Sequence, residues 1–363
     1  MSFKKKLQKI FKTLSQKIFV SIYGKILIKK NYNFLNENNL NKVDKVIIDK
    51  NRYNCFKIIN GRIYTDLIEN VAVISNSILI PGACFQKING NLKSNKVNIC
   101  LKKGTPRIKI KKSGTLLALI QDASENNYSH WLLDILPRIK IFEKNNSIKQ
   151  IDHFLLPELK YSYQYETLKM LNIPLNKIIS DKKNRHIESE ILITTDHPWY
   201  KRGNIHDEMV NIPKWIILWI RQKFLKHAVY KNVCDKIYID RKDSLFNHCK
   251  IINSEDVWKF LKKRGFKKLE LSKFNFRNQI GIFNSAKIIV GAHGAGLSNI
   301  IFSKPGTKVI EIKPKNHVNE VFSRISKINN LNHKKIVSVS LRSKIENNLG
   351  DILVDLNDIS NKL

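Results

Sequence analysis

The sequence lacks the cysteine patterns that hold a zinc ion or a disulfide framework. Its five cysteines are odd in number, and none of them forms a C-x-x-C pair. We therefore expect reduced core cysteines in a cytoplasmic protein. The chain also has no uninterrupted apolar run of roughly 18 residues, and its first residues lack the apolar segment of a signal peptide. Neither a membrane-spanning helix nor a secretion signal is therefore expected.

Acidic residues are scarce, because 30 Asp and Glu face 65 Lys and Arg, which gives a net charge of +35. Such a charge is typical of proteins that bind nucleic acid or an anionic membrane. Lys, Asn and Ile are enriched together throughout, as expected from a codon bias toward A and T, so much of the lysine excess is a solvated surface. Because no zinc-ligand spacing, RNP-type aromatic motif or basic zipper accompanies the charge, no nucleic-acid partner is expected.

Residues 1–30 are predicted to form a basic amphipathic helix. Apolar residues recur there at three- and four-residue spacing, and lysines occupy most of the positions between them. Such a helix could lie in the interface of an acidic membrane leaflet, or it could pack on its own domain, and the pattern leaves both open. The recurring apolar residues are Phe3, Leu7, Ile10, Phe11, Leu14, Ile18, Ile22 and Ile26.

The chain of 363 residues is too long for one ordinary core and predicts two domains. Residues 44–120 contain short extended runs broken by Asn, Gly and Pro, and helix-like and strand-like segments alternate after residue 121. Strands spaced by helices predict parallel sheets with right-handed crossovers. We therefore predict an α/β fold with two Rossmann-like domains, residues 31–230 and 231–363, that face a central ligand-binding cleft.

The segment Gly291–Asn299 is rich in small residues, and it joins a strand-like run to a helix-like one. Its spacing, G-x-x-G-x-G, differs from the dinucleotide fingerprint, and a tight turn without a ligand is the alternative. Main-chain N–H groups at a helix start suit a phosphate or diphosphate. His293 adds a hydrogen-bond donor inside the turn, and Glu311 follows Gly291 by 20 residues, where nucleotide-binding units often place the acid that accepts ribose hydroxyls. A nucleoside diphosphate therefore fits this segment.

A second candidate site lies in Asn127–Arg138. His130 and Asp134 stand four residues apart, so on a helix they share one face and can hydrogen-bond. A carboxylate in that position fixes the imidazole tautomer and raises its basicity, which is how a general base is held. The alternative is an ordinary surface or capping pair, with Trp131 and its neighbours in the core.

Together these motifs resemble glycosyltransferase family 61, in their order as well as their separation. The similarity covers about residues 115–335. Its motifs are Asn127-Tyr128-x-His130-Trp131-Leu132-x-Asp134-x-Leu136-Pro137-Arg138, Tyr238-Ile239-Asp240-Arg241, Gln279, Gly291-x-His293-Gly294-Ala295-Gly296-Leu297-Ser298-Asn299-x-x-Phe302 and Val309-Ile310-Glu311-Ile312.

The resemblance implies a GT-B architecture and an inverting transfer of a sugar from a nucleotide-diphosphate donor to a saccharide or lipid-linked saccharide acceptor. In bacterial members it implies assembly of capsular or other surface polysaccharide. The base would be His130 or Asp134, and the acceptor side would include Asn127, Tyr128, Trp131 and Arg138. The donor-binding residues would be Arg241, Lys250, His293, Gly294, Ala295, Gly296, Leu297, Ser298, Asn299 and Glu311, with Glu311 on the ribose.

No D-x-D element lies in the similar region, so neither a metal nor any cofactor beyond the nucleotide sugar is expected. The chain departs from the family at one segment. Members usually carry a pair of arginines and an Asn-Glu there, whereas this chain has Cys249–Ser254, in which Lys250 keeps one positive charge. The alternative function is therefore a catalytically weakened sugar-nucleotide-binding subunit of a polysaccharide assembly complex. The expected location is the cytoplasm, peripherally at the inner face of the cell membrane.

Overall fold

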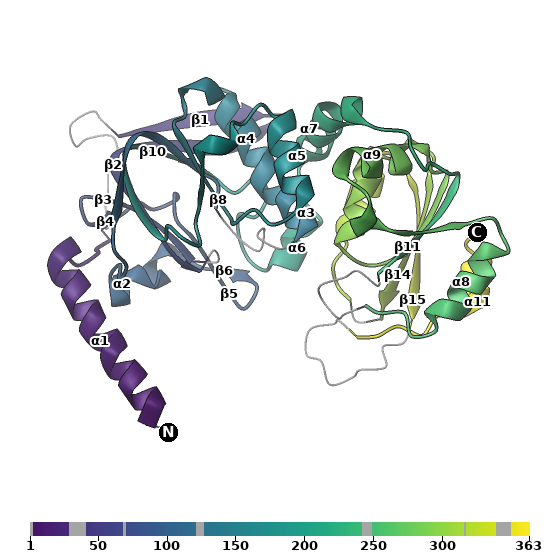
Figure 1. Cartoon of the computed structure of the whole chain (residues 1–363), viewed down its shortest axis with the longest axis horizontal. Coiled ribbons are helices and arrows are strands. Elements are labelled where there is room, and N and C mark those ends of the chain that lie inside the picture. The colour runs from purple at the N-terminus through teal and green to yellow at the C-terminus, as the bar shows by residue number, and fades with distance from the viewer. Residues whose placement is uncertain are drawn as a thin grey trace. The chain divides into compact units, whose positions relative to one another are not determined.

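Two β-sheets organise the chain, and each lies in its own unit (Figure 1). The first unit comprises residues 1–160 and 172–205, and the second comprises residues 161–171 and 206–363. Both units combine a sheet with helices, so the predicted α/β class is confirmed. The computed structural model describes residues 3–28, 41–67, 70–120, 127–241, 249–315, 317–338 and 350–363.

The described part of the first unit contains one mixed sheet, formed by β1 (Lys42–Ile48), β2 (Asn51–Leu67), β3 (Asn70–Ser75), β4 (Ile78–Leu79), β5 (Phe85–Ile88), β6 (Asn91–Leu92), β7 (Ile110–Ala118), β8 (His153–Leu156), β9 (Ile178–Ser180) and β10 (His186–Thr195). Strands β10, β7, β8 and β9 are neighbours in that order and run parallel. Strand β2 joins β10 antiparallel, and β1 and β3 to β6 continue antiparallel. The unit therefore joins a parallel α/β segment to an antiparallel meander.

The helices of the first unit are α1 (Phe3–Tyr23), α2 (Cys100–Lys103), α3 (Tyr128–His130) and α4 (Leu136–Glu143). A π-helical turn, Trp131–Ile135, connects α3 to α4, so the predicted helix in this region contains one wide turn. Such turns are rare in proteins, and those that occur are often found at functional sites. Among the described residues, no helix is both long enough and apolar enough to cross a bilayer.

The sheet of the second unit is purely parallel in the described residues. Its strands are β11 (Lys236–Asp240), β12 (Lys267–Glu270), β13 (Ile288–Ala292), β14 (Lys308–Pro314) and β15 (Asn332–Ser338). They are ordered β12-β11-β13-β14-β15. The central strands read as continuous apolar runs because helices cover both faces of such a sheet, and Ile289, Val290 and Ile310 have no exposed surface.

The helices of the second unit are α5 (Ser162–Met170), α6 (Ile205–Met209, which begins at the unit boundary), α7 (Lys214–Phe224), α8 (Ser254–Lys262), α9 (Phe276–Ser285), α10 (Val321–Ile328) and α11 (Leu356–Ser360). The 3₁₀ helix η7 (Ala295–Phe302) follows β13. The chain leaves β11 through α8 to β12 on one side and then crosses through α9 to β13 on the other side. The carboxyl ends of β11 and β13 are therefore the topological switch point, where open parallel sheets bind ligands.

A glycine allows α9 to approach the chain that precedes β11. A Cβ atom on Gly281 would collide with the main-chain carbonyl of Val229, and main chain cannot rotate away as a side chain can. We predict that Gly281→Ala destabilises the fold by about 1 to 3 kcal/mol, measured by urea denaturation. Lys259→Ala, which places the same residue at an exposed position of α8, is the control and should change stability by less than about 0.5 kcal/mol. Equal stability of the two variants would contradict the packing argument.

Candidate functional site

The second unit carries polar side chains at the carboxyl ends of β11 and β13. Arg241 directly follows β11, and His293 directly follows β13. The Arg241 guanidinium donates a hydrogen bond to the main-chain carbonyl of His293. A Cβ atom on Gly294 would collide with this guanidinium, so a larger residue at position 294 would force the Arg241 side chain to move. The structure thus brings together three residues of the sequence-based donor site at the topological switch point.

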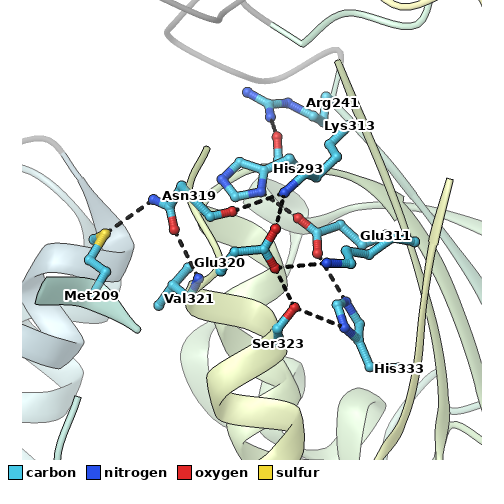
Figure 2. Close-up of polar contacts among 11 residues, drawn as sticks. Met209, Arg241, His293, Glu311, Lys313, Asn319, Glu320, Val321, Ser323 and His333 are labelled. Carbon is cyan, nitrogen blue, oxygen red and sulfur yellow. Dashed lines mark hydrogen bonds and ion pairs between the residues drawn. The ribbon is translucent and has the colours of Figure 1, made fainter. Parts of the chain in front are cut away.

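A buried carboxylate links two histidines beneath this point (Figure 2). His293 Nδ1 lies 2.5 Å from Glu311 Oε1, and His333 Nε2 lies 2.9 Å from Glu311 Oε2. Glu311 is 1% exposed. Burial raises the pKa of Glu311, but the hydrogen bonds and charges of the two imidazoles lower it more, to about 2. The carboxylate therefore stays ionised, and each imidazole nitrogen that faces it must carry a proton.

This arrangement gives Glu311 contacts that the sequence pattern did not suggest. The sequence pattern suggested that the carboxylate accepts ribose hydroxyls, as the acid at the tip of the next strand often does. In the structure both of its oxygens are hydrogen-bonded to imidazoles and the side chain is buried. Glu311 therefore positions His293 from below, because the register of β13 and β14 sets it opposite Gly291, two residues before the histidine.

The network continues from His333 to the start of α10, and Figure 2 shows it as one set of contacts between this helix and the sheet. The Ser323 hydroxyl donates to Glu320 Oε2 at 2.6 Å and lies 3.3 Å from His333 Nδ1. A hydroxyl has one proton, so toward His333 it can only accept. His333 thus has a carboxylate oxygen beside Nε2 and a hydroxyl oxygen beside Nδ1.

Two lysines neutralise the carboxylate at the far end of this network. Lys313 Nζ lies 2.6 Å from Glu320 Oε1, and Lys335 Nζ lies 3.0 Å from Glu320 Oε2. Burial raises the pKa of Glu320, but the hydrogen bonds from Lys313, Ser323 and Lys335 lower it more, to about 2. Lys313 is itself 4% exposed, so its cationic group is held in the protein rather than in solvent.

Aromatic packing holds the His293 ring from the other side. The His317 ring lies 3.9 Å from it between centroids, and the Phe322 ring lies 4.9 Å from it. Burial lowers the pKa of His317 to about 3, and the charges of His293 and Lys313 add to this effect. His317 is therefore a neutral ring at physiological pH, and the imidazole of His293 is held between a carboxylate and two aromatic rings.

The glycine-rich turn presents main chain rather than side chains. The side chains of residues 297–299 are buried. Asn299 Nδ2 donates to Gln279 Oε1 at 2.9 Å and to the Gly296 carbonyl at 3.1 Å, so it fixes the turn to α9. By contrast, the first N–H groups of η7, those of Ala295 and Gly296, have no partner within the helix. Of the predicted donor residues in this turn, the structure therefore favours main-chain N–H groups over the side chains at 297–299.

Lys250 has a different environment from the other predicted donor residues. Its main-chain carbonyl accepts a hydrogen bond from the N–H of Ile352 at 2.8 Å. Its side chain is exposed, whereas Cys249 before it is fully buried. The structure thus fixes the main chain at Lys250 and leaves its ammonium group in solvent.

The first unit carries the other predicted pair, and the structure brings it together. His130 Nδ1 lies 2.7 Å from Asp134 Oδ2 across the π-helical turn. Asn127 begins this helix, because its side chain accepts hydrogen bonds from the N–H groups of Ser129 and His130. The His130 side chain is 12% exposed, and the Asp134 side chain is 1% exposed. Of the two, His130 is therefore the group that solvent or a substrate can reach.

Asp134 has two further partners from the segment after β10. Trp199 Nε1 donates to Asp134 Oδ1 at 2.8 Å. His197 Nδ1 accepts the N–H of Tyr200 at 3.0 Å, so its proton is on Nε2, which lies 3.7 Å from Asp134 Oδ2. Burial raises the pKa of Asp134, but His130 and then His197 lower it more, to well below the ordinary value of a carboxyl group. Asp134 therefore remains a carboxylate that accepts a hydrogen bond from the Nδ1–H of His130.

The other residues predicted for the acceptor side differ in exposure. Asn127 and Tyr128 are half-buried in the first turn of α3, whereas Trp131 and Arg138 are fully buried. Arg138 donates to both hydroxyls of the pair Thr194 and Thr195 and to main-chain carbonyls at the ends of β7 and β10. Burial lowers the pKa of Arg138 to about 9, so it stays charged. Trp131 and Arg138 thus attach the helix to the sheet.

Several residues that belong to the contacts around Glu311 and Asp134 carried no recognisable sequence signal. His333 is 22 residues from Glu311, and Trp199 is 65 residues from Asp134. Lys313 and Glu320 stand in a segment without a motif. Only the parallel register of β14 and β15, which pairs Val309 with His333, brings the second histidine to the carboxylate. Among the described residues, no group of three or more His, Cys, Asp or Glu is arranged to hold a metal ion.

The comparison with protein families identifies the family of this chain. The family model for glycosyltransferase 61 matches residues 128–310, half of the chain, and the match contains both the His130–Asp134 pair and the turn after β13. The chain belongs to glycosyltransferase family 61. A search of curated proteins finds no match.

The buried neutral state of His317 predicts a pH dependence of stability. Its folded pKa of about 3 lies below its ordinary value of 6.5, so between these pH values the unfolded chain binds more protons and stability falls as the pH is lowered. We expect His317→Phe, which keeps a ring against His293, to remove on the order of 1 to 3 kcal/mol of this loss. Urea denaturation at several pH values from 7 down to about 4 measures it. Parallel stability curves for both proteins would contradict the assignment.

Proposed function

We propose that this glycosyltransferase moves a sugar from a nucleotide-diphosphate donor to a saccharide or lipid-linked saccharide acceptor, with inversion and without a metal, in surface or capsular polysaccharide biosynthesis. Family membership supports the transferase class. The observation that carries the donor assignment is the set of cationic and N–H donors at the switch point of the parallel sheet. A GT-B architecture and a cytoplasmic location at the inner face of the membrane are part of this proposal.

In the proposed donor site, the leaving diphosphate binds at the start of η7. The N–H groups of Ala295 and Gly296 stand at the start of the helix, where the helix dipole favours a bound anion. Arg241 adds a guanidinium whose planar donors match phosphate oxygens. His293, whose Nδ1–H donates a hydrogen bond to Glu311, presents Nε2 to the ligand. These groups stabilise the negative charge that develops on the diphosphate as the glycosidic bond to it breaks.

In the proposed acceptor step, His130 is the general base and Asp134 positions it. The His130 Nδ1–H donates a hydrogen bond to the Asp134 carboxylate, so the neutral ring has its lone pair on Nε2, the nitrogen that we assign to the acceptor hydroxyl. The hydroxyl oxygen attacks the anomeric carbon as its proton moves to Nε2, and the bond from that carbon to the diphosphate oxygen breaks. Of the two candidates left open by the sequence, His130 is favoured because Asp134 is buried and both of its oxygens have partners.

The base assignment predicts a large loss of turnover with donor binding retained. His130→Ala should lower kcat by about 10² to 10⁴, and Asp134→Asn should also lower it, because an amide can donate to Nδ1 and so reverse the tautomer. UDP affinity, measured by titration calorimetry, should change little in both. His153→Ala, a half-buried histidine at the start of β8, is the control. Near-normal kcat in both dyad variants would remove this assignment.

The donor assignment predicts a loss of nucleotide affinity. Gly294→Ala displaces the Arg241 guanidinium, and Arg241→Lys loses its planar donors, so each should raise the Kd for UDP, or for the nucleoside diphosphate that binds best, by about tenfold or more. Calorimetry or thermal shift reads this directly, with Lys259→Ala as control. Lys250→Ala, measured alongside, shows whether the exposed ammonium contributes. Unchanged affinity in both of the first variants would refute this donor site.

The second candidate function is a sugar-nucleotide-binding subunit with weakened catalysis in a polysaccharide assembly complex. The observation behind it is the segment Cys249–Ser254, where family members usually carry arginines, together with the exposed position of Lys250. Hydrolysis of a panel of nucleotide sugars distinguishes the two functions. A transferase turns over a matching donor slowly in water, whereas a binding subunit binds it without turnover.

A further inference from the structure

Helix α1 has one face that packs on the first unit. Tyr23 OH accepts the N–H of Lys109 at 3.0 Å, and its ring lies edge-on to His186 with 5.0 Å between centroids. The Phe19 ring stacks on Tyr23, one helical turn earlier. The helix ends at Gly24, which has a φ of 77° and whose N–H donates to the Val20 carbonyl. The carboxyl-terminal end of α1 is therefore firmly attached to the unit.

The face of α1 away from this attachment is apolar and exposed. At about 100° per residue its members fall within an arc of roughly 120°, and this arc is centred opposite the side that carries Phe19 and Tyr23. Each member is between 52% and 73% exposed. Figure 1 shows the helix extending away from the sheet of its own unit toward its N-terminal end. The exposed apolar face consists of Leu7, Ile10, Phe11, Leu14, Ile18 and Ile22.

The charge of the helix indicates what covers this face. The sequence of α1 contains six lysines and no acidic residue. Lys6 and Lys17, both exposed, lie along one edge of the apolar arc. If a second copy covered the face, two lysine-rich helices would be brought together and would repel each other. An anionic surface with an apolar interior satisfies both the lysines and the apolar side chains.

We propose that the exposed apolar face of α1 inserts into the headgroup region of an anionic lipid bilayer, with Lys6 and Lys17 at the lipid phosphates. The helix lies in the plane of the interface, since lysines recur along its length. Its attachment through Tyr23 then holds the first unit at the membrane surface. Membrane binding of this kind is independent of turnover, so it can be tested apart from the glycosyltransferase activity.

The test is sedimentation of the full-length protein with vesicles of phosphatidylcholine alone or of phosphatidylcholine with phosphatidylglycerol. The double variant Phe11→Glu with Ile18→Glu changes the apolar face. The double variant Ile47→Glu with Ile88→Glu makes the same charge change at exposed positions of β1 and β5 and is the matched control. Thermal unfolding checks that both variants fold, which is expected because all four side chains are exposed.

We expect the wild type and the control to sediment with the anionic vesicles, and the α1 variant to bind them at least about tenfold more weakly. Lys6→Gln with Lys17→Gln should weaken binding to anionic vesicles only, as should added salt. Equal binding by the α1 variant and its control overturns the proposal, as does a wild type that stays in the supernatant. Light scattering that shows a dimer dissociated by the α1 variant, without vesicle binding, would assign the face to a second copy instead.

Discussion

The structure depends on carboxylates that stay ionised although they are buried. A buried carboxylate without partners would take up a proton, and a neutral acid could donate to an imidazole as well as accept from it. Glu311 has a histidine on each oxygen, and Asp134 has His130 on one oxygen and Trp199 on the other. Because these partners lower the pKa of both carboxyl groups, each carboxylate can only accept. The ring nitrogen that faces each carboxylate is then protonated.

A histidine held by a buried carboxylate occurs in both units, and its surroundings differ between them. In the first unit the carboxylate puts a proton on Nδ1 of His130, the member of the pair that a substrate can reach, so the neutral ring has its lone pair on Nε2, which suits proton removal. In the second unit it holds His293 beside the carboxyl ends of β11 and β13, next to a guanidinium and a helix start, which suits an anion. The family match over residues 128–310 contains His130, Asp134 and His293, whereas Glu311 and His333 follow it. The proposed mechanism assigns the base to the first unit and the leaving group to the second.

Local patterns predicted the parts of the sites that are local. His130 and Asp134 share one helix, and the strand, the glycine turn and η7 are contiguous, so spacing and the small residues Gly291, Gly294 and Gly296 were sufficient. The roles of Glu311 and Asn299 were not predictable in this way, because each depends on partners in other elements. His333 and Trp199 could not be found, since strand register and the path after β10 bring them in. The antiparallel half of the first sheet lies in residues that carry no family motif.

The tautomers of His130 and His293 test the central claim most directly. Nitrogen-15 NMR of labelled protein near neutral pH distinguishes a protonated from an unprotonated ring nitrogen. We predict a proton on Nδ1 of both histidines, an unprotonated Nε2 on His130, and loss of the His130 preference in Asp134→Asn. A His130 ring protonated on Nε2 alone, or one whose tautomer is unchanged by Asp134→Asn, would contradict the claim that a buried carboxylate sets the reactive nitrogen.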